Sequence, residues 1–519
     1  MTATVRTIKP RAGVLGSLRV QGAWWYWLVP VALGLGAFYI RAVGLRTANE
    51  VFIDELTYVD LARDVADGYL PNLNGELFFL HPPGWFLVTG LVVKAFGLTG
   101  SAIEVVYQLR WLNAVLGALV VVLAYLITRR VNNAAAATLV AVVLAFDPFV
   151  LRMDSRVMME TPTTALLMAG WLVLLPAVRH SAPWRPVVAG LLFGCAVLVK
   201  DIGFVLAVVP LLLALVWRRT LAPRLVLVAA GATIVPYAIY LVFLLLGGHL
   251  GDWWTAKSLG LGRMAGLVQI SGFNAPNAPN LGSRLVEEVG RFGTSYVLIL
   301  LCLLAGVGAS FSASAPRRLI GLIALVSGAL GVYAAFIGTL EEQFGYYVVV
   351  PSALALAVVA VESVERGLLN RKLVVGVAVA FAALTAVLGL SARLVTDDAY
   401  RRVDAWLTKN VPPGTKVGLT GVTAEFAYLP RTGYGVWPSL ESLAKHDAEY
   451  VVTQRRSLRD GYGYAAPELL DWLSRNALPV YSAGGPTGEQ TTVWQLSTYR
   501  TAKAVRTGER IPPVNGPHE

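Results

Sequence analysis

The stretch that decides the fold reads FIDE at residues 52–55 and HPPGW at residues 81–85. Apolar segments precede and follow it, so it is a polar loop between membrane-embedded pieces. Two adjacent carboxylates, Asp54 and Glu55, stand at its start, and His81 followed by two prolines stands at its end. We expect most of the remaining chain to hold this loop at a membrane surface.

The composition is that of a polytopic helical membrane protein. Of 519 residues, 56% are hydrophobic and 14% are charged, and the mean hydropathy is +0.61. A soluble protein would carry about a quarter charged residues. The net charge of +11 fits basic inner loops and anionic lipid headgroups, with no nucleic-acid partner. Cys195 and Cys302 lie in apolar segments, which excludes a disulfide framework and a thiol metal site.

The apolar segments predict about eleven transmembrane helices in a bundle. With this count, every proposed inner turn is rich in arginine or lysine. Residues 1–22, basic and without an acid, are then cytoplasmic, and the loop after the first helix is on the outer side. The segment 84–98 is short and carries Lys94, so it reads as a juxtamembrane or re-entrant element, with a true span as the main alternative. The predicted spans are 23–44, 109–128, 134–151, 161–178, 187–199, 202–217, 225–247, 294–311, 319–340, 345–361 and 373–391.

The composition changes to that of a soluble domain after about residue 392. Residues 23–391 form the expected transmembrane domain, with an outer catalytic loop at 45–108. Residues 392–505 form an expected extracytoplasmic α/β domain, and 506–519 a disordered tail. Strand-like runs at 416–420, 450–453, 480–482 and 492–496 alternate with helical patterns at 397–410 and 467–475.

Polar residues concentrate in the outer loops. Asp54 could cap an amphipathic helix over 54–69, or could accept a proton from an acceptor hydroxyl. Acids at the outer end of a span, such as Asp154 and Glu160, are costly to bury and favour a functional role. Arg156 and Glu160 are four residues apart and could pair on one helix face.

Basic residues of the later outer loops allow two interpretations. Lys200 interrupts a mostly apolar segment, 187–217, so it either belongs to a tight turn or pairs with a lipid phosphate. Arg110 at the start of a span has the same two readings. In the long loop 248–292, Lys257, Arg263, Arg284 and Arg291 fit a solvated face better.

A metal site is the weakest of these interpretations. Asp54, Glu55 and Asp154 could together hold a divalent ion, but no spacing requires it. The sequence contains no phosphate-binding glycine loop and no dinucleotide-binding glycine motif. No organic cofactor is therefore predicted.

The ordered set of these motifs resembles a known superfamily, the polyprenyl-phosphate-sugar-dependent GT-C glycosyltransferases. The branches of this superfamily that the chain resembles are the protein O-mannosyltransferases and the lipid A aminoarabinose transferases. The resemblance rests on the first-loop Asp-Glu pair, the His-Pro-Pro of 81–83, Arg110 and the run Arg156–Glu160. Tyr346-Tyr347 before Pro351 fits a family pattern more faintly, and the first 200 residues carry most of the likeness.

The resemblance implies transfer of a sugar from a polyprenyl phosphate to an acceptor glycan, lipid or protein outside the membrane. Asp54 matches the family's catalytic aspartate, and Glu55 is its neighbour. A lipid phosphate leaves readily, so positioning, cations and one base suffice for an inverting displacement. We expect Asp54 to be the base. Support of the base or binding of the acceptor is expected for Glu55, Glu160, Asp154 and His81. Binding of the donor phosphate is expected for Arg110, Arg156 and Lys200, and His81 is a further candidate for this second role.

The chain departs from the family at three points. Some lipid A-modifying members carry lysine at the position of His81. Members similar to protein mannosyltransferases carry histidine there, as this chain does. Near Tyr346-Tyr347 no arginine is present, which shifts the phosphate role toward Lys200 or the 257–291 segment. The soluble domain also differs from the β-trefoil insert of eukaryotic protein mannosyltransferases, so a protein acceptor does not follow.

Two other functions compete with the transferase. A secondary transporter or lipid flippase would show repeat symmetry and polar groups at mid-span. The sequence has no evident repeat, and its polar residues lie in outer loops. A non-catalytic scaffold would leave Asp54, Glu55 and His81 without a role.

Overall fold

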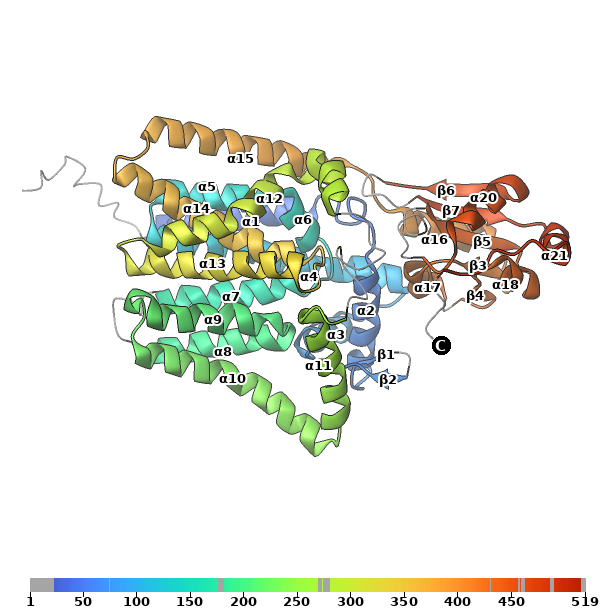
Figure 1. Ribbon diagram of the computed structural model, residues 1–519, viewed down its shortest axis with the longest axis horizontal. Helices are drawn as coiled ribbons and strands as arrows, with labels where there is room; N and C mark the ends of the chain where they lie inside the picture. The colour runs from blue at the N-terminus through green and yellow to red at the C-terminus, as the bar shows by residue number, and fades with distance from the viewer. Residues whose placement is uncertain are drawn as a thin grey trace, which may run out of the picture.

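The computed structural model describes residues 23–73, 75–175, 182–268, 273, 281–429, 431–455, 458, 463–485 and 490–514. They form a helical bundle and a smaller α/β domain, which follow each other along the longest axis of the molecule (Figure 1). The predicted class, a mainly helical membrane protein with a small α/β domain, is confirmed. The predicted cytoplasmic segment 1–22 lies outside the described residues.

Among the described residues of the bundle, fewer helices than predicted have the length of a full span. Seven described helices are long and apolar enough to cross a membrane, or eight if α5 and α6, bent by 63°, form one span. The count of about eleven is not confirmed, because helices such as α7 and α8 have only 15 and 16 residues. The bundle helices are α1 (Ala23–Ala42), α4 (Ala102–Val131), α5 (Ala134–Phe146), α6 (Pro148–Asp154), α7 (Glu160–Leu174), α8 (Trp184–Val199), α9 (Ile202–Val216), α10 (Pro223–Leu246), α12 (Leu281–Ser310), α13 (Ala315–Phe336), α14 (Phe344–Glu365) and α15 (Arg371–Leu394).

The long loop expected at 248–292 is largely helical. It contains α11 (Leu250–Met264), and α12 begins at Leu281, well before the predicted 294. Helix α4 likewise begins at Ala102 and not at 109, because Ser101 and Glu104 form a capping box. Hydropathy finds only the part of a helix that lies in hydrocarbon, so polar first turns were missed.

One end of the bundle carries several short elements. Helix α2 (Ile53–Ala66), the strands β1 (Asn72–Leu73) and β2 (Glu76–Leu77), helix α3 (Gly84–Phe96) and α11 lie at the end that faces the α/β domain (Figure 1). The 13 residues of α3 rise about 20 Å, less than the ~30 Å of a hydrocarbon core. This length favours a re-entrant or juxtamembrane α3, which stays a prediction.

The α/β domain is built on a mixed sheet of five strands in the order β4-β3-β5-β7-β6. Strand β3 pairs in parallel with β4 and β5, and β7 pairs antiparallel with β5 and β6. Four strands were predicted; β4 was missed because its three residues, YGV, show no alternation. The strands are β3 (Val417–Leu419), β4 (Tyr434–Val436), β5 (Tyr450–Gln454), β6 (Leu478–Ala483) and β7 (Thr491–Gln495), and the helices are α16 (Ala399–Asn410), α17 (Val422–Tyr428), α18 (Leu440–Lys445), α20 (Pro467–Asn476) and α21 (Thr498–Arg506).

The expected disorder of 506–519 is wrong for the part that the structure describes. Ile511 is buried and its carbonyl accepts a hydrogen bond from the Leu440 N–H (3.4 Å). The Val514 N–H donates to the Tyr464 carbonyl (3.0 Å). One buried apolar side chain and these backbone bonds anchor the segment, while 515–519 lie outside the described residues.

The α/β domain is joined to the loop that precedes α2. The Glu50 carboxylate accepts the Ala399 N–H (2.5 Å) and the Tyr400 N–H (3.3 Å) at the start of α16. The Asp397 N–H donates to the Thr47 carbonyl (2.6 Å). The domain therefore rests on the same loop that leads into the Asp-Glu pair.

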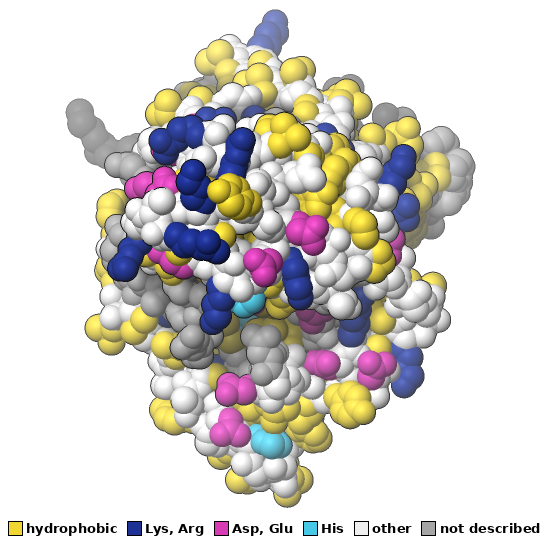
Figure 2. All heavy atoms as spheres, turned by 90° about the vertical axis from the view of Figure 1, so that its right-hand side faces the viewer, with side chains coloured by type: hydrophobic (Ala, Val, Ile, Leu, Met, Phe, Trp, Pro, Cys, Tyr) yellow, Lys and Arg dark blue, Asp and Glu magenta, His cyan; other side chains and the backbone are white. Residues whose placement is uncertain are grey.

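The α/β domain and the helical bundle differ in surface chemistry. Figure 2 shows lysine, arginine, aspartate and glutamate side chains interspersed over the end formed by the α/β domain. The bundle helices instead expose large apolar side chains, such as Leu246 and Phe336, each 83% exposed. Apolar flanks of this kind suit a lipid environment, and the charged end suits water.

Candidate active site

The two adjacent carboxylates point in different directions because they lie in the first turn of α2. The N-cap of α2 is Phe52 and not Asp54, so the expected capping role of Asp54 is wrong. Glu55 performs the capping, since its carboxylate accepts the Phe52 N–H (3.0 Å). Consecutive helix residues differ by about 100° in direction, so the two carboxylates meet different neighbours.

Glu55 is fully buried in an ion pair with Arg110 of α4. Arg110 Nε donates to Glu55 Oε1 (2.9 Å) and Nη2 to Oε2 (2.6 Å), and neither side chain is exposed. The Val157 N–H donates to Glu55 Oε1 (2.8 Å), which ties the second outer loop to α2. Glu55 thereby joins three segments that are distant in the sequence.

Arg110 has no donor left for a lipid phosphate. Its remaining N–H groups bond the backbone carbonyls of Leu45 (3.4 Å), Asn49 (2.8 Å) and Glu50 (3.2 Å). A guanidinium has five N–H donors, and all five are engaged here. We therefore reassign Arg110 from phosphate binding to positioning of the first outer loop.

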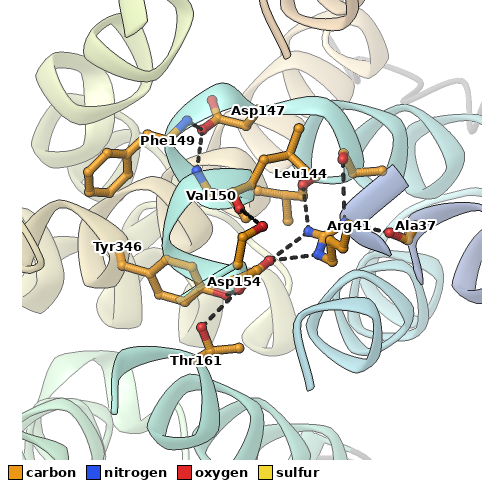
Figure 3. Close-up of polar contacts among 12 residues, drawn as sticks. Ala37, Arg41, Leu144, Asp147, Phe149, Val150, Asp154, Thr161 and Tyr346 are labelled. Atoms are coloured by element: carbon orange, nitrogen blue, oxygen red, sulfur yellow. Dashed lines mark hydrogen bonds and ion pairs between the residues drawn. The ribbon is translucent and has the colours of Figure 1, made fainter. Parts of the chain in front are cut away.

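Asp154 is the centre of a second closed network. It accepts hydrogen bonds from Arg41 Nε (2.8 Å), Thr161 Oγ1 (2.9 Å) and Tyr346 Oη (2.6 Å), as Figure 3 shows. Arg41 Nη2 forms an ion pair with the same carboxylate at 2.7 Å, and both side chains are fully buried. The acceptor positions of Asp154 are filled, so its expected role in acceptor binding is not supported by this geometry.

Asp54 differs from both of these acids. The residue is partly exposed, and no ion pair of the described residues includes it. Burial of the carboxyl, followed by the negative charge of Glu341, raises the pKa of Asp54 to about 7, with a further rise from Glu160. The charges of Lys200 and Arg156 act in the opposite direction. A carboxylate with a pKa near neutrality is suited to take up a proton.

Lys200 and Glu160 form an ion pair beside Asp54. Lys200 Nζ donates to Glu160 Oε1, and Glu160 is fully buried at the start of α7. The other oxygen, Glu160 Oε2, is buried and has no hydrogen-bond partner among the described residues. Glu160 therefore has one oxygen that can accept a hydrogen bond from a substrate.

The His-Pro-Pro-Gly motif brings His81 to the same place. Pro83 caps α3, and a Cβ on Gly84 would lie 2.5 Å from the Leu198 carbonyl oxygen, so glycine permits this approach to the end of α8. His81 packs against the rings of Tyr58 and Phe78, with centroids 6.4 and 6.1 Å apart.

Burial and nearby cations keep the imidazole of His81 neutral. Burial, then the charges of Lys200, Lys257 and Arg263, hold the pKa of His81 well below its ordinary value. A neutral imidazole can donate one hydrogen bond and accept another. His81 can therefore contact a phosphate or a hydroxyl without adding charge.

Lys257 was expected on a solvated face, but it points into this end of the bundle. Its Nζ donates to Asp201 Oδ2 (2.6 Å) and to the Leu80 carbonyl (3.0 Å), next to His81. Arg263, also on α11, pairs with Glu341 at 2.7 Å. The sequence did not predict that these two side chains lie here, because the segment of α11 was predicted as a loop and no helix face could be assigned to them.

Arg156 is a buried cation with donors to spare. It lies 5.1 Å from the centroid of the Phe52 ring, and Nη2 donates to the Glu50 carbonyl (3.4 Å). Its Nε has no hydrogen-bond partner in the part of the chain that the structure describes. Burial, then the neighbouring charge of Arg152, lowers the pKa of Arg156 to about 10, so it is still a cation at neutral pH.

The proposed divalent-ion set does not come together. Asp54, Glu55 and Asp154 lie in different networks, since the second and third are each paired with an arginine. Among the described residues, no group of three or more His, Cys, Asp or Glu side chains could hold a metal ion.

Comparisons with known proteins agree with the architecture. Residues 84–250 match the family described as dolichyl-phosphate-mannose-protein mannosyltransferase. A search of curated proteins returned no match.

Solved structures resemble nearly the whole chain. ArnT from Cupriavidus metallidurans bound to undecaprenyl phosphate is 16% identical, with 91% of this chain and 98% of that chain covered and a TM-score of 0.54. The oligosaccharyltransferase of Archaeoglobus fulgidus, in complex with Zn and sulfate, is 16% identical, with coverage of 91% and 73% and a TM-score of 0.55. The expected resemblance is thereby confirmed, and the chain has the GT-C fold of the polyprenyl-phosphate-sugar glycosyltransferases.

Proposed function

We propose that this protein transfers a sugar from a polyprenyl phosphate to an acceptor hydroxyl at the outer membrane surface. The observation that carries the proposal is the state of Asp54. It is the partly exposed acid of the Asp-Glu pair, it has no ion-pair partner among the described residues, and its pKa is raised to about 7. The fold and the family match at 84–250 support the same class of donor.

The reaction is a direct displacement at the anomeric carbon. The acceptor oxygen forms a bond to that carbon while the bond to the phosphate oxygen breaks, and the lipid phosphate leaves with the electron pair. Asp54 accepts the proton of the acceptor hydroxyl. A single displacement inverts the configuration at the anomeric carbon.

Cations at the site stabilise the leaving phosphate. Lys200 and Arg156 lie near Asp54, and Lys200, Lys257 and Arg263 lie near His81. Their charges offset the negative charge that develops on the phosphate oxygen as the bond breaks. His81 adds a neutral hydrogen bond, and Glu160 Oε2 is available to orient the acceptor.

The test is transfer by the purified protein from a panel of radiolabelled polyprenyl-phosphate sugars that includes mannose, arabinose and aminoarabinose. We expect one donor to release polyprenyl phosphate and to form a product with inverted configuration, read by NMR of the anomeric proton. Product of retained configuration would exclude the single displacement. If the protein moved the intact donor between vesicle leaflets without transfer, the flippase alternative would hold instead.

A further inference from the structure

A cavity separate from the Asp54 site lies between the outer-loop end of α15 and the start of α6. Its wall includes Asn49 of the first outer loop, Phe292 of α12, and three arginines: Arg152, Arg291 and Arg393. No carboxylate is among the described residues that line it, and neither Asp54 nor Lys200 does so. The wall of this cavity is therefore cationic.

Arg393 is buried at this cavity, and no described carboxylate forms an ion pair with it. It is 3% exposed, Nη1 donates to Ser155 Oγ (2.8 Å), and Nη2 donates to the carbonyls of Arg41 and Val43. The Asn49 amide, if flipped, adds one more neutral acceptor at 2.9 Å. No ion pair among the described residues includes Arg393, and its Nε has no hydrogen-bond acceptor. A buried guanidinium without an anion is costly, so this cavity favours an anion.

The other two arginines of the wall add donors. Arg152 pairs with Glu342 at 3.2 Å, but its buried Nε also has no acceptor. Arg291 pairs with Glu288 at 3.4 Å, and its side chain is 37% exposed, so it can reach a ligand at the rim. The Nε atoms of Arg152 and Arg393 are buried, so these two arginines favour an anion through their charge, and Arg291 at the rim can donate to the oxygens of a phosphate group.

The apolar surroundings indicate where this phosphate comes from. The last turn of α15 lines the cavity, and the same turn exposes Leu390 and Leu394 on the flank of the bundle. On α12, Val289 is also exposed, two residues from Arg291. An acyl chain on this apolar flank would place a phosphate headgroup at the arginines. We propose that this cavity binds the phosphate group of an anionic membrane lipid.

Native mass spectrometry of the full-length protein can test the site. The protein is purified from detergent that contains equal amounts of phosphatidylglycerol and phosphatidylcholine. We expect the wild type to retain mainly phosphatidylglycerol, and the Arg291→Gln variant to retain roughly tenfold less, because a hydrogen bond to a charged group is lost. Arg366→Gln, an exposed arginine paired with Glu362 at the other end of α14, is the matched control and should retain as much as the wild type.

Two further measurements make the result decisive. Arg393→Gln should also lose the lipid, and its thermal unfolding shows whether the protein is still folded, since Arg393 bonds backbone carbonyls as well. Inorganic phosphate at millimolar concentration should not displace the lipid; displacement would mean that the site takes free phosphate and would overturn the lipid assignment. The site itself would be overturned if the wild type retained both lipids equally. It would also be overturned if the wild type and Arg291→Gln retained equal amounts of phosphatidylglycerol. The assay uses no sugar donor, so its outcome is independent of the proposed transferase.

Discussion

Two groups of carboxylates lie at the same end of the bundle and differ in how their charge is neutralised. Glu55 and Asp154 are fully buried, and each is paired with an arginine. Asp54 is partly exposed and shares its surroundings with Glu160, Glu341 and several cations. Closed ion pairs hold segments together, and an acid without a fixed partner is available for a proton. Glu55 and Asp154 therefore hold the segments of this end in place, whereas Asp54 is the acid that is available for a proton.

The largest effect should follow from Asp54→Asn. An amide has nearly the same shape but cannot accept the proton, so we expect the transfer rate to fall about 10²- to 10⁴-fold. Thermal unfolding should be unchanged, because Asp54 has no ion pair to lose. Asp60→Asn on the same helix is the matched control, since Asp60 only forms an exposed pair with Arg63 (3.5 Å). Undiminished transfer by folded Asp54→Asn protein would remove Asp54 as the base.

Glu55→Ala should act on stability first. It leaves Arg110 buried without its counter-ion, which costs about 3–5 kcal/mol in the free energy of unfolding. Denaturant unfolding in detergent measures the loss. The double variant Glu55→Ala/Arg110→Met removes both charges and should recover part of it, because no unpaired charge remains. If the double variant were less stable than the sum of the single ones predicts, the ion pair would not be the source of the effect.

Much of this difference between paired and unpaired carboxylates could not be predicted from the sequence. The Asp-Glu pair and the second outer loop were recognised, because acids and arginines stand out against apolar segments. Which of the two adjacent acids is paired depends on the first helical residue of α2 and on Arg110, 55 residues away. No local pattern contains either fact.

Arg41 shows where a signal was present but not used. It lies within the predicted first span, where a charged residue is rare and requires a partner. Its partner, Asp154, is 113 residues away. The helix ends were equally difficult: polar first turns, such as that of α12 from Leu281, extend past the hydrophobic run that identifies a span.

Gly117→Ala should disturb the closed network by a smaller amount. A Cβ at this position of α4 would lie 2.3 Å from Asp154 Cγ and 2.7 Å from Arg41 Nε. Both side chains are fully buried and cannot move away freely, so we expect a loss of about 1–3 kcal/mol in unfolding free energy. Gly36→Ala on the neighbouring α1, where a new Cβ meets no atom within 4 Å, is the control and should be neutral. Equal stability of both variants would show that the Arg41–Asp154 contact is not tightly packed.

The pH dependence of transfer should report the Asp54 carboxyl. The base is active when deprotonated, so kcat/KM should rise about tenfold per pH unit below pH 7 and level off above it. This parameter reflects the free enzyme, which is the state in which burial and Glu341 raise the pKa of Asp54 to about 7. A profile that is flat between pH 5 and 8 would exclude Asp54 as the titrating base.

The smallest expected effect tests whether the acid limb of the pH profile, where kcat/KM rises with pH, belongs to Asp54. Glu341→Gln removes the negative charge that raises the pKa of Asp54, so the acid limb should move to lower pH while the plateau changes little. Glu342→Gln is the matched control: it is adjacent, but its charge is paired with Arg152 (3.2 Å) and is not among the largest that act on Asp54. A shift in Glu342→Gln as large as that in Glu341→Gln would show that the limb follows the net charge of this end and not the carboxyl of Asp54.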